Sequence, residues 1–268
     1  MQTRRLLVFL AALTAIGALP SVVFAQATKD QSSLVFTISG GWVGGSKLWS
    51  SSPQPIQFLS PADTFAVDRR IRSTLAVGFG GVYFPGENVG VTVEGFLIGL
   101  GFEDFCRHLF SSGAAATAQV CESIQGKKKA ATTVILSAGP MFRLNSRKLF
   151  SPYGRINLGL VLSQQSSLRT SGQFVNDLGQ IEDLFVYSDD HNSRVDPSVA
   201  LGLGFTAAVA RGYNLRWELR DNITGVQSVT GTIPIAGFVP PHERVFKHLF
   251  SMTVGFDVVL ERRRGRRY

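Results

Sequence analysis

The stretch YNLRWELRDN, residues 213–222, alternates apolar and charged side chains over its central six residues. Strict alternation of this kind predicts a β-strand whose two faces differ, because successive side chains of a strand point to opposite sides. One face carries Leu215, Trp217 and Leu219, and the other carries Arg216, Glu218 and Arg220. Three ionised groups on one face need either water or partners, since an unpaired buried charge is costly. The rest of the chain decides which environment this face meets.

A period of two recurs along most of the sequence. Seven further runs place large apolar residues on one side and mostly Gly, Ala, Ser and Thr, with a few charges, on the other. No stretch beyond the first twenty residues stays apolar for the ~18 residues that a membrane helix needs. The eight runs cover residues 34–42, 74–83, 91–98, 133–143, 155–162, 198–209, 213–222 and 250–260.

The connections between these runs alternate in length. Three are short and rich in turn-forming residues: PGEN (85–88), NSRK (145–148) and RG (211–212). Four are long and polar, at residues 46–70, 103–130, 164–195 and 222–245. An even number of strands with alternating long and short connections predicts an all-β fold, an up-and-down antiparallel barrel of eight strands.

The size of the apolar side chains indicates which face of the barrel they occupy. An eight-stranded barrel is only wide enough for its interior to be filled by side chains, and about forty large apolar groups exceed that space. The small and polar face fits the narrow lumen, so the apolar face points outward into lipid. Four aromatic residues near the short turns fit an interfacial girdle: Tyr83, Phe142, Tyr153 and Tyr213. A soluble lipocalin-like carrier, with the faces reversed, is the less favoured alternative.

The amino terminus has the composition of a secretory signal. A basic MQTRR is followed by an apolar run at 6–19 and by small residues that place cleavage after Ala25 or Ala27. We therefore assign residues 1–27 to a signal peptide, 28–260 to the barrel and 261–268 to a basic tail. The formal charge is +8, but no basic stripe with interleaved aromatics is present, so no nucleic-acid partner is expected.

Taken together, these features resemble the small outer-membrane β-barrels of Gram-negative bacteria, the OmpA/OmpX-type class. The resemblance rests on the signal peptide, the eight alternating strands, the three tight turns, the four long loops and the final apolar strand HLFSMTVGFDVVL (248–260). It implies a location in the bacterial outer membrane, with the termini and short turns in the periplasm. It also implies contact with outer-membrane lipid and an extracellular ligand bound through the four long loops.

The charged residues of the small face gather in the periplasmic half of the lumen on this orientation. We hypothesise that they form a paired, hydrogen-bonded plug, since Arg presents a planar fork that suits carboxylates. The alternative is a hydrated gap that the same residues line without direct pairing. The cluster comprises Glu94, Arg143, Arg155, Arg216, Glu218, Arg220 and Asp257.

Both cysteines, Cys106 and Cys121, fall in the long connection 103–130. Exported chains pass through an oxidising compartment, so a disulfide that closes this loop is expected. Two free thiols are the alternative.

Residues that suggest catalysis or metal binding are few. His248, Ser251 and Asp257 could form a triad, but strand parity places His248 outward and the other two inward. The segment SDDHN (188–192) could bind a divalent cation, although a solvated polar loop is the simpler interpretation. We therefore expect no catalytic, cofactor or metal site.

These inferences favour a non-enzymatic outer-membrane barrel with a charge-plugged lumen, which acts through its surface loops and as a structural component of the membrane. The alternative is a small channel or carrier for apolar solutes. A lipid-modifying barrel enzyme is less favoured. The first two differ in whether the lumen is plugged or open.

Overall fold

The computed structural model describes residues 32–261 with seven gaps, at 52, 57–59, 111–114, 145–147, 164–165, 191–193 and 232–236. The expected signal peptide at 1–27, with its cleavage after Ala25 or Ala27, lies outside the described residues. Residues 262–268 of the expected basic tail do so as well.

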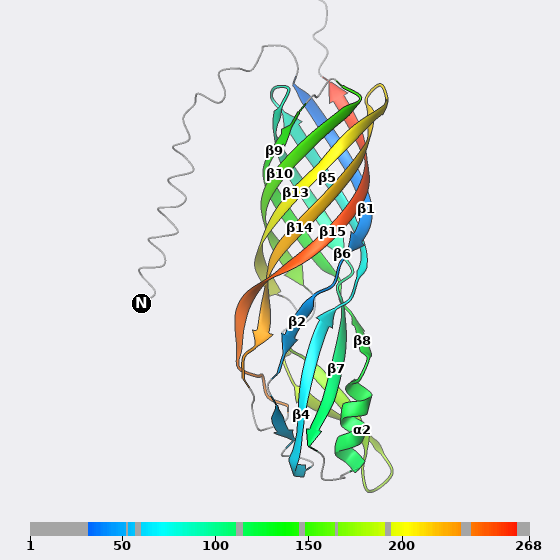
Figure 1. Cartoon of the computed structure of the whole chain (residues 1–268), viewed down its shortest axis with the longest axis vertical. Helices are drawn as coiled ribbons and strands as arrows, with labels where there is room; N and C mark the ends of the chain where they lie inside the picture. The colour runs from blue at the N-terminus through cyan, green and yellow to red at the C-terminus, as the bar shows by residue number, and fades with distance from the viewer. Residues whose placement is uncertain are drawn as a thin grey trace, which may run out of the picture.

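Eight antiparallel strands form a closed barrel, which confirms the predicted fold class (Figure 1). Strand β1 pairs with β5 on one side and with β15 on the other, so the sheet has no free edge. The order around the barrel is β1-β15-β14-β13-β10-β9-β6-β5. Their bounds are β1 Ser33–Val43, β5 Thr74–Phe84, β6 Val89–Ile98, β9 Thr133–Arg143, β10 Phe150–Ser163, β13 Arg194–Ala210, β14 Tyr213–Val229 and β15 His242–Glu261.

The exterior of the barrel is apolar, as the sequence predicts. Trp42, Leu219 and Phe250 are each about two-thirds exposed, whereas the alternating residues of the same strands point into the lumen. An exterior of this kind is stable in hydrocarbon, where a closed barrel also satisfies every backbone hydrogen bond. The lumen is correspondingly lined by small and polar side chains.

The aromatic girdle at the short-turn end contains three of the four expected residues. Tyr83, Phe142 and Tyr213 are exposed on the exterior, but Tyr153 is buried in the lumen. The expectation for Tyr153 is wrong because it lies two residues from Arg155 on β10 and therefore shares the inward face of that strand.

The four long connections were expected to be polar loops, and this expectation is wrong over much of their length. The fourth connection extends the barrel strands, with β14 running to Val229 and β15 beginning at His242. The first two connections form a second sheet, in the order β2 (Lys47–Ser50), β4 (Ser60–Ile71), β7 (Gly101–Phe110) and β8 (Lys127–Ala130), and β3 (Gln54–Ile56) pairs with β4. A helix, α2 (Ala115–Ile124), and a hairpin of β11 (Thr170–Val175) and β12 (Ile181–Tyr187) complete this part. We call these elements the distal domain; they lie beyond the long-connection end of the barrel (Figure 1).

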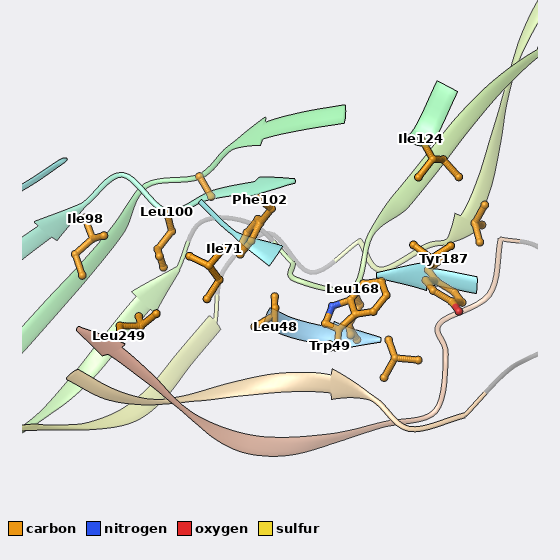
Figure 2. Close-up of a cluster of buried hydrophobic side chains, with 14 of the residues drawn as sticks. Leu48, Trp49, Ile71, Ile98, Leu100, Phe102, Ile124, Leu168, Tyr187 and Leu249 are labelled. Atoms are coloured by element: carbon orange, nitrogen blue, oxygen red, sulfur yellow. The ribbon is translucent and has the colours of Figure 1, made fainter. Parts of the chain in front are cut away.

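A continuous apolar core joins the distal domain to the barrel mouth. Leu48, Trp49 and Phe102 belong to the distal domain, and Ile98 and Leu249 of the barrel strands join the same cluster (Figure 2). Trp49 packs edge-on against Tyr187, with 5.8 Å between ring centroids. Because one core serves both parts, the distal domain is fixed to the barrel by packing and not by flexible linkers.

Only one helix, α2, is present among the described elements. Within the described ranges, no helix combines the length and the hydropathy that a membrane span requires.

A disulfide joins Cys106 of β7 to Cys121 of α2, as the sequence predicts. Both side chains are buried in the distal core, so the bond fastens the helix to the sheet. It closes a loop with a sequence separation of 15 residues. Cross-linking a loop of this size restricts the unfolded chain and contributes about 3 kcal/mol in the loop-entropy model.

Replacing both cysteines, C106S/C121S, is expected to destabilise the distal domain by about 3 kcal/mol while the barrel stays folded. The measurement is limited proteolysis of protein in lipid vesicles, read as faster cleavage near α2. Reduction of the unmutated protein serves as the matched control and should give the same cleavage pattern. Equal cleavage rates before and after the change would contradict a stabilising role.

Candidate functional site

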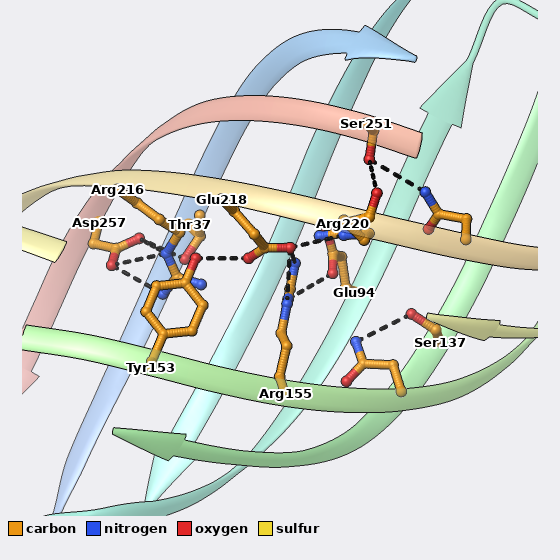
Figure 3. A network of polar contacts seen from close by, with 12 residues as sticks. Thr37, Glu94, Ser137, Tyr153, Arg155, Arg216, Glu218, Arg220, Ser251 and Asp257 are labelled. Carbon is orange, nitrogen blue, oxygen red and sulfur yellow. Dashed lines mark hydrogen bonds and ion pairs between the residues drawn. The ribbon is translucent and has the colours of Figure 1, made fainter. Parts of the chain in front are cut away.

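Three strands direct four charged side chains toward one another in the lumen. Glu94 lies on β6, Arg155 on β10, and Glu218 and Arg220 on β14 (Figure 3). Arg155 contacts Glu94 at 2.7 Å and Glu218 at 2.6 Å. Arg220 contacts the same two carboxylates, at 2.7 Å and 2.8 Å. The four side chains therefore form a closed ring of alternating charge that bridges the lumen.

Glu218 is the most heavily used member of this ring. Its Oε1 atom accepts hydrogen bonds from Arg155 and Arg220, and its Oε2 atom accepts one from the Tyr153 hydroxyl at 2.6 Å. The Arg220 guanidinium lies 4.6 Å from the centroid of the Phe96 ring. Two aromatic residues, Tyr153 and Phe96, thus contact the charged ring, and the pattern of charges in the sequence did not predict these contacts.

A second ion pair lies beside the ring, toward the short-turn end. Arg216 of β14 donates from Nη2 to Asp257 of β15 at 2.9 Å and from Nε at 3.0 Å. Thr37 of β1 donates to the same carboxylate at 2.7 Å. The Arg216 guanidinium also lies 5.0 Å from the centroid of the Tyr153 ring, so the tyrosine connects this pair to the ring of four.

Arg143 is the one residue of the predicted cluster that lies apart. Its Nε donates to the main-chain carbonyl of Glu87 at 2.6 Å, and its guanidinium lies 3.7 Å from the centroid of the Phe84 ring. It occupies the end of β9 next to a short turn. Arg143 therefore belongs to the rim of the barrel, and the other six residues form what we call the lumen network.

The lumen network is buried and electrically balanced. Its three arginines and three carboxylates are each less than a tenth exposed, with Asp257 at 1% and Glu218 at 2%. A buried charge without its partner would cost several kcal/mol, whereas paired charges with further hydrogen bonds offset most of that cost. The balance of three against three thus explains how one strand can carry three charges inward.

Glycines on the neighbouring strand make room for the network. A Cβ atom at Gly202 would lie 3.0 Å from both the Arg155 side chain and the Glu218 carboxylate. At Gly204 it would lie 2.7 Å from the Tyr153 hydroxyl. The small residues of the inward face are therefore required by volume, which agrees with their assignment from strand parity.

Apolar and amide side chains lie in the lumen on the two sides of the network. Toward the short turns, Val35, Val82, Phe84 and Met141 form a small buried cluster. Toward the distal domain, the Asn157 amide donates to Ser137 at 3.4 Å and the Asn222 amide to Ser251 at 3.3 Å. The void beside the network measures about 10 Å³, which holds about one water molecule.

A cavity of about 40 Å³ lies at the barrel mouth, between the amide layer and the distal core. Its wall is mainly apolar and includes Leu48, Ile71, Leu100 and Phe102. Four polar atoms on its wall have no hydrogen-bond partner within the described part of the chain: Thr133 Oγ1, Arg194 Nε, Thr224 Oγ1 and Gln227 Oε1. A volume of this size holds a few water molecules, which can satisfy such atoms.

The distal domain contains a further buried ion pair, which the sequence analysis did not predict. Arg69 of β4 and Asp104 of β7 contact each other at 2.5 Å and 2.6 Å and are almost completely inaccessible. Arg69 also donates to the carbonyls of Ser167 and Arg169 and to the Thr170 hydroxyl, at 2.7–2.8 Å. The arginine therefore fastens the start of the β11 hairpin to the sheet.

Lys129 of β8 lies near this pair. Its Nζ donates to the carbonyl of Arg169 at 2.8 Å. Burial, followed by repulsion from Arg69, lowers the pKa of Lys129 to about 8. The group is thus partly neutral at mildly alkaline pH, and the local charge is smaller than the sequence KKK suggests.

The candidate catalytic residues do not meet. His248 faces outward, and its Nδ1 lies 2.6 Å from the Asp221 carboxylate, whereas Ser251 and Asp257 are buried in the lumen. In SDDHN, Asp189 accepts a hydrogen bond from Ser166 at 2.7 Å and pairs with Arg194, and His191 lies outside the described residues. No group of three or more His, Cys, Asp and Glu residues suited to a metal occurs in the described ranges.

No protein-family model matches the sequence, and no curated protein does. Several solved structures are similar. Neisserial surface protein A is 10% identical, with a TM-score of 0.42, covering 84% of this chain and 96% of its own. Ail of Yersinia pestis, in complex with the heparin analogue sucrose octasulfate, is 12% identical, with a TM-score of 0.39 and coverages of 86% and 99%. Outer membrane protein AlkL is 14% identical, with a TM-score of 0.40 and coverages of 91% and 96%.

Because the identities are low and the TM-scores lie below 0.5, the fold assignment rests on the protein's own strand pairing and surface. A closed antiparallel barrel of eight strands with an apolar exterior and a polar, filled lumen is the architecture of small outer-membrane proteins. The protein has the fold of an outer-membrane β-barrel.

Proposed function

We propose that the protein is a non-conducting, non-enzymatic outer-membrane barrel that holds a rigid distal domain at the cell surface. The lumen network is the observation that carries the first part of this proposal. Its ring of Glu94, Arg155, Glu218 and Arg220 bridges three strands, and the void beside it measures only about 10 Å³. A passage for ions would need a continuous chain of water, and a void of one water supports closure.

The distal domain supports the second part of the proposal. A barrel whose lumen is closed acts through what it displays, and this barrel displays a sheet, a helix and a hairpin with a shared apolar core. Folded surfaces of this kind present fixed side chains. Binding to them therefore costs less ordering entropy than binding to flexible loops does. We infer that the distal domain faces the exterior and binds an extracellular partner, while the barrel serves as its anchor and as part of the membrane structure.

Reconstituted in planar lipid bilayers, the protein is expected to give no channel steps, because the network leaves no ion path. A variant in which the ring is truncated, E94A/R155A/E218A/R220A, is expected to conduct if it still inserts. The control is R211Q, in the exposed turn between β13 and β14, which should stay silent. Steady conductance by the unmutated protein would contradict a closed lumen.

A carrier for apolar solutes remains the second candidate because the mouth cavity has an apolar wall. Its volume of about 40 Å³ is small for such a solute. Binding therefore requires the mouth to open. Displacement of a fluorescent apolar probe by alkanes or fatty acids, lost on narrowing the cavity with Leu100→Trp, would favour this function over the first.

A further inference from the structure

The outer face of the distal sheet carries a hollow of about 470 Å³ between cationic side chains. Lys47 comes from β2, Arg70 from β4 and Arg107 from β7. Phe105 and Asp68 form the rest of its charged and aromatic lining. We call this hollow the basic groove.

The Asp68 carboxylate does not form close hydrogen bonds with the cations of the basic groove. Lys47 Nζ and Arg107 Nη2 each lie 3.6 Å from an Asp68 oxygen, beyond hydrogen-bond distance, and their side chains are 53% and 67% exposed. Asp68 already accepts a hydrogen bond from the Ser50 hydroxyl. The Arg70 guanidinium lies 4.8 Å from the centroid of the Phe105 ring, which holds it in place without neutralising it.

The charged residues beside the basic groove leave its net charge positive. In the register of the sheet, Arg70 lies opposite Glu103, and Glu103 lies opposite Lys128. Directly opposed residues share a face, so four cations face two carboxylates. The other two lysines of β8 are engaged on the opposite face, where their amino groups donate to the carbonyls of Ser171 and Arg169. The charge excess therefore belongs to the outer face alone.

The cations begin at the rim of the lipid-facing surface. Trp42 and Leu75 mark the end of the apolar exterior on β1 and β5, at 65% and 63% exposure. Arg72 is exposed and lies three residues before Leu75, a distance of about 10 Å along an extended chain. Arg70 and then Arg107 continue the series away from the barrel on the same face of the sheet. The positive column thus starts next to the apolar exterior and continues away from the barrel.

We infer that the basic groove binds the phosphorylated saccharide headgroup of an outer-leaflet glycolipid of the protein's own membrane. A sugar chain anchored in the leaflet rises beside the barrel and presents phosphates at successive heights, which matches a column that begins at the rim. Arg forks bind phosphate in bidentate fashion, and Lys acts as a point charge. This inference rests on the proposed outward orientation and names one partner of the distal domain.

The test uses full-length protein in detergent micelles, titrated with dye-labelled lipopolysaccharide and followed by fluorescence anisotropy. The variant K47Q/R70Q/R107Q is expected to bind about a hundredfold more weakly, since each cation near an anionic surface contributes a factor of about five. Its salt dependence should also be shallower. R211Q, with one cation removed from the opposite end of the barrel, is the control and should bind normally.

A variant with the opposite expected sign guards against misfolding. D68N keeps the shape of Asp68 and its contact with Ser50 but removes the competing negative charge, so lipopolysaccharide should bind more tightly. Unchanged binding in both variants would overturn the inference. So would equal binding to phosphatidylglycerol vesicles, which have anionic headgroups without saccharide, or binding to soluble dextran sulfate in place of lipopolysaccharide. Conductance is measured separately, so an open lumen would refute the closed barrel and leave this result standing.

Discussion

Replacement of Glu218 by alanine is expected to lower the free energy of unfolding by about 3–5 kcal/mol, the usual cost of removing one partner from a buried ion pair. Glu218 accepts hydrogen bonds from Arg155, Arg220 and Tyr153, and all of these groups are buried. Without the carboxylate, the ring retains two arginines against Glu94 alone. The excess positive charge in a lumen with room for one water is the physical reason for the large effect.

The measurement is a urea titration of protein folded in lipid vesicles, followed by tryptophan fluorescence. Trp217 is adjacent to Glu218 on β14 and faces the opposite side, so it reports on this strand without belonging to the network. The matched control is E243A, an exposed carboxylate on β15, which should change stability by no more than about 0.5 kcal/mol. Equal losses in the two variants would show that the network contributes nothing specific.

A double variant separates pairing from simple packing. Because R155M/E218L removes one charge of each sign, its loss should be smaller than the sum of the two single losses. Strict additivity would indicate that the two side chains act independently, against the 2.6 Å contact between them.

Replacement of Arg69 by methionine is expected to destabilise the distal domain by about 3–5 kcal/mol and to leave the barrel folded. The change leaves the Asp104 carboxylate buried without its charge partner. It also removes the donors to two carbonyls at the start of the β11 hairpin. Methionine fills a similar volume, so the loss comes from the charge and the hydrogen bonds.

Two readouts on vesicle-embedded protein distinguish the domains. Limited proteolysis should cut the distal domain faster, while heat-modifiable migration on a gel should stay that of a folded barrel. The neighbouring variant R70M is the matched control, because Arg70 points to the opposite, exposed face. If R69M and R70M were cleaved at the same rate, the buried pair would have no special role in the domain.

Strand parity was enough to predict the barrel, its inward charges and its outward apolar face. The pattern at 213–222 illustrates this: Arg216, Glu218 and Arg220 are buried and Leu219 is exposed, as alternation requires. The error over Tyr153 came from ranking its aromatic character above its parity with Arg155. Position along a strand therefore carried more information here than residue type.

The distal domain could not be predicted in the same way. Its pairings join segments far apart, as when Val67 of β4 meets Cys106 of β7, and no local period reports such contacts. Register shifts in β2 and at the start of β4 also break the alternation. Arg69 sits in the polar run DRR, which looks solvated in sequence, and only the partner at Asp104 reveals that it is buried.

Strands β14 and β15 run unbroken from the barrel into the distal region, over 17 and 20 residues, and the apolar core continues beside them. If the barrel tilts in the bilayer, the distal domain therefore tilts with it by the same angle. Substitutions in the distal domain are restricted for the same reason. Insertions should be tolerated at the exposed hairpin tip around Leu178, which is 82% exposed, and not along the sheet that supports it.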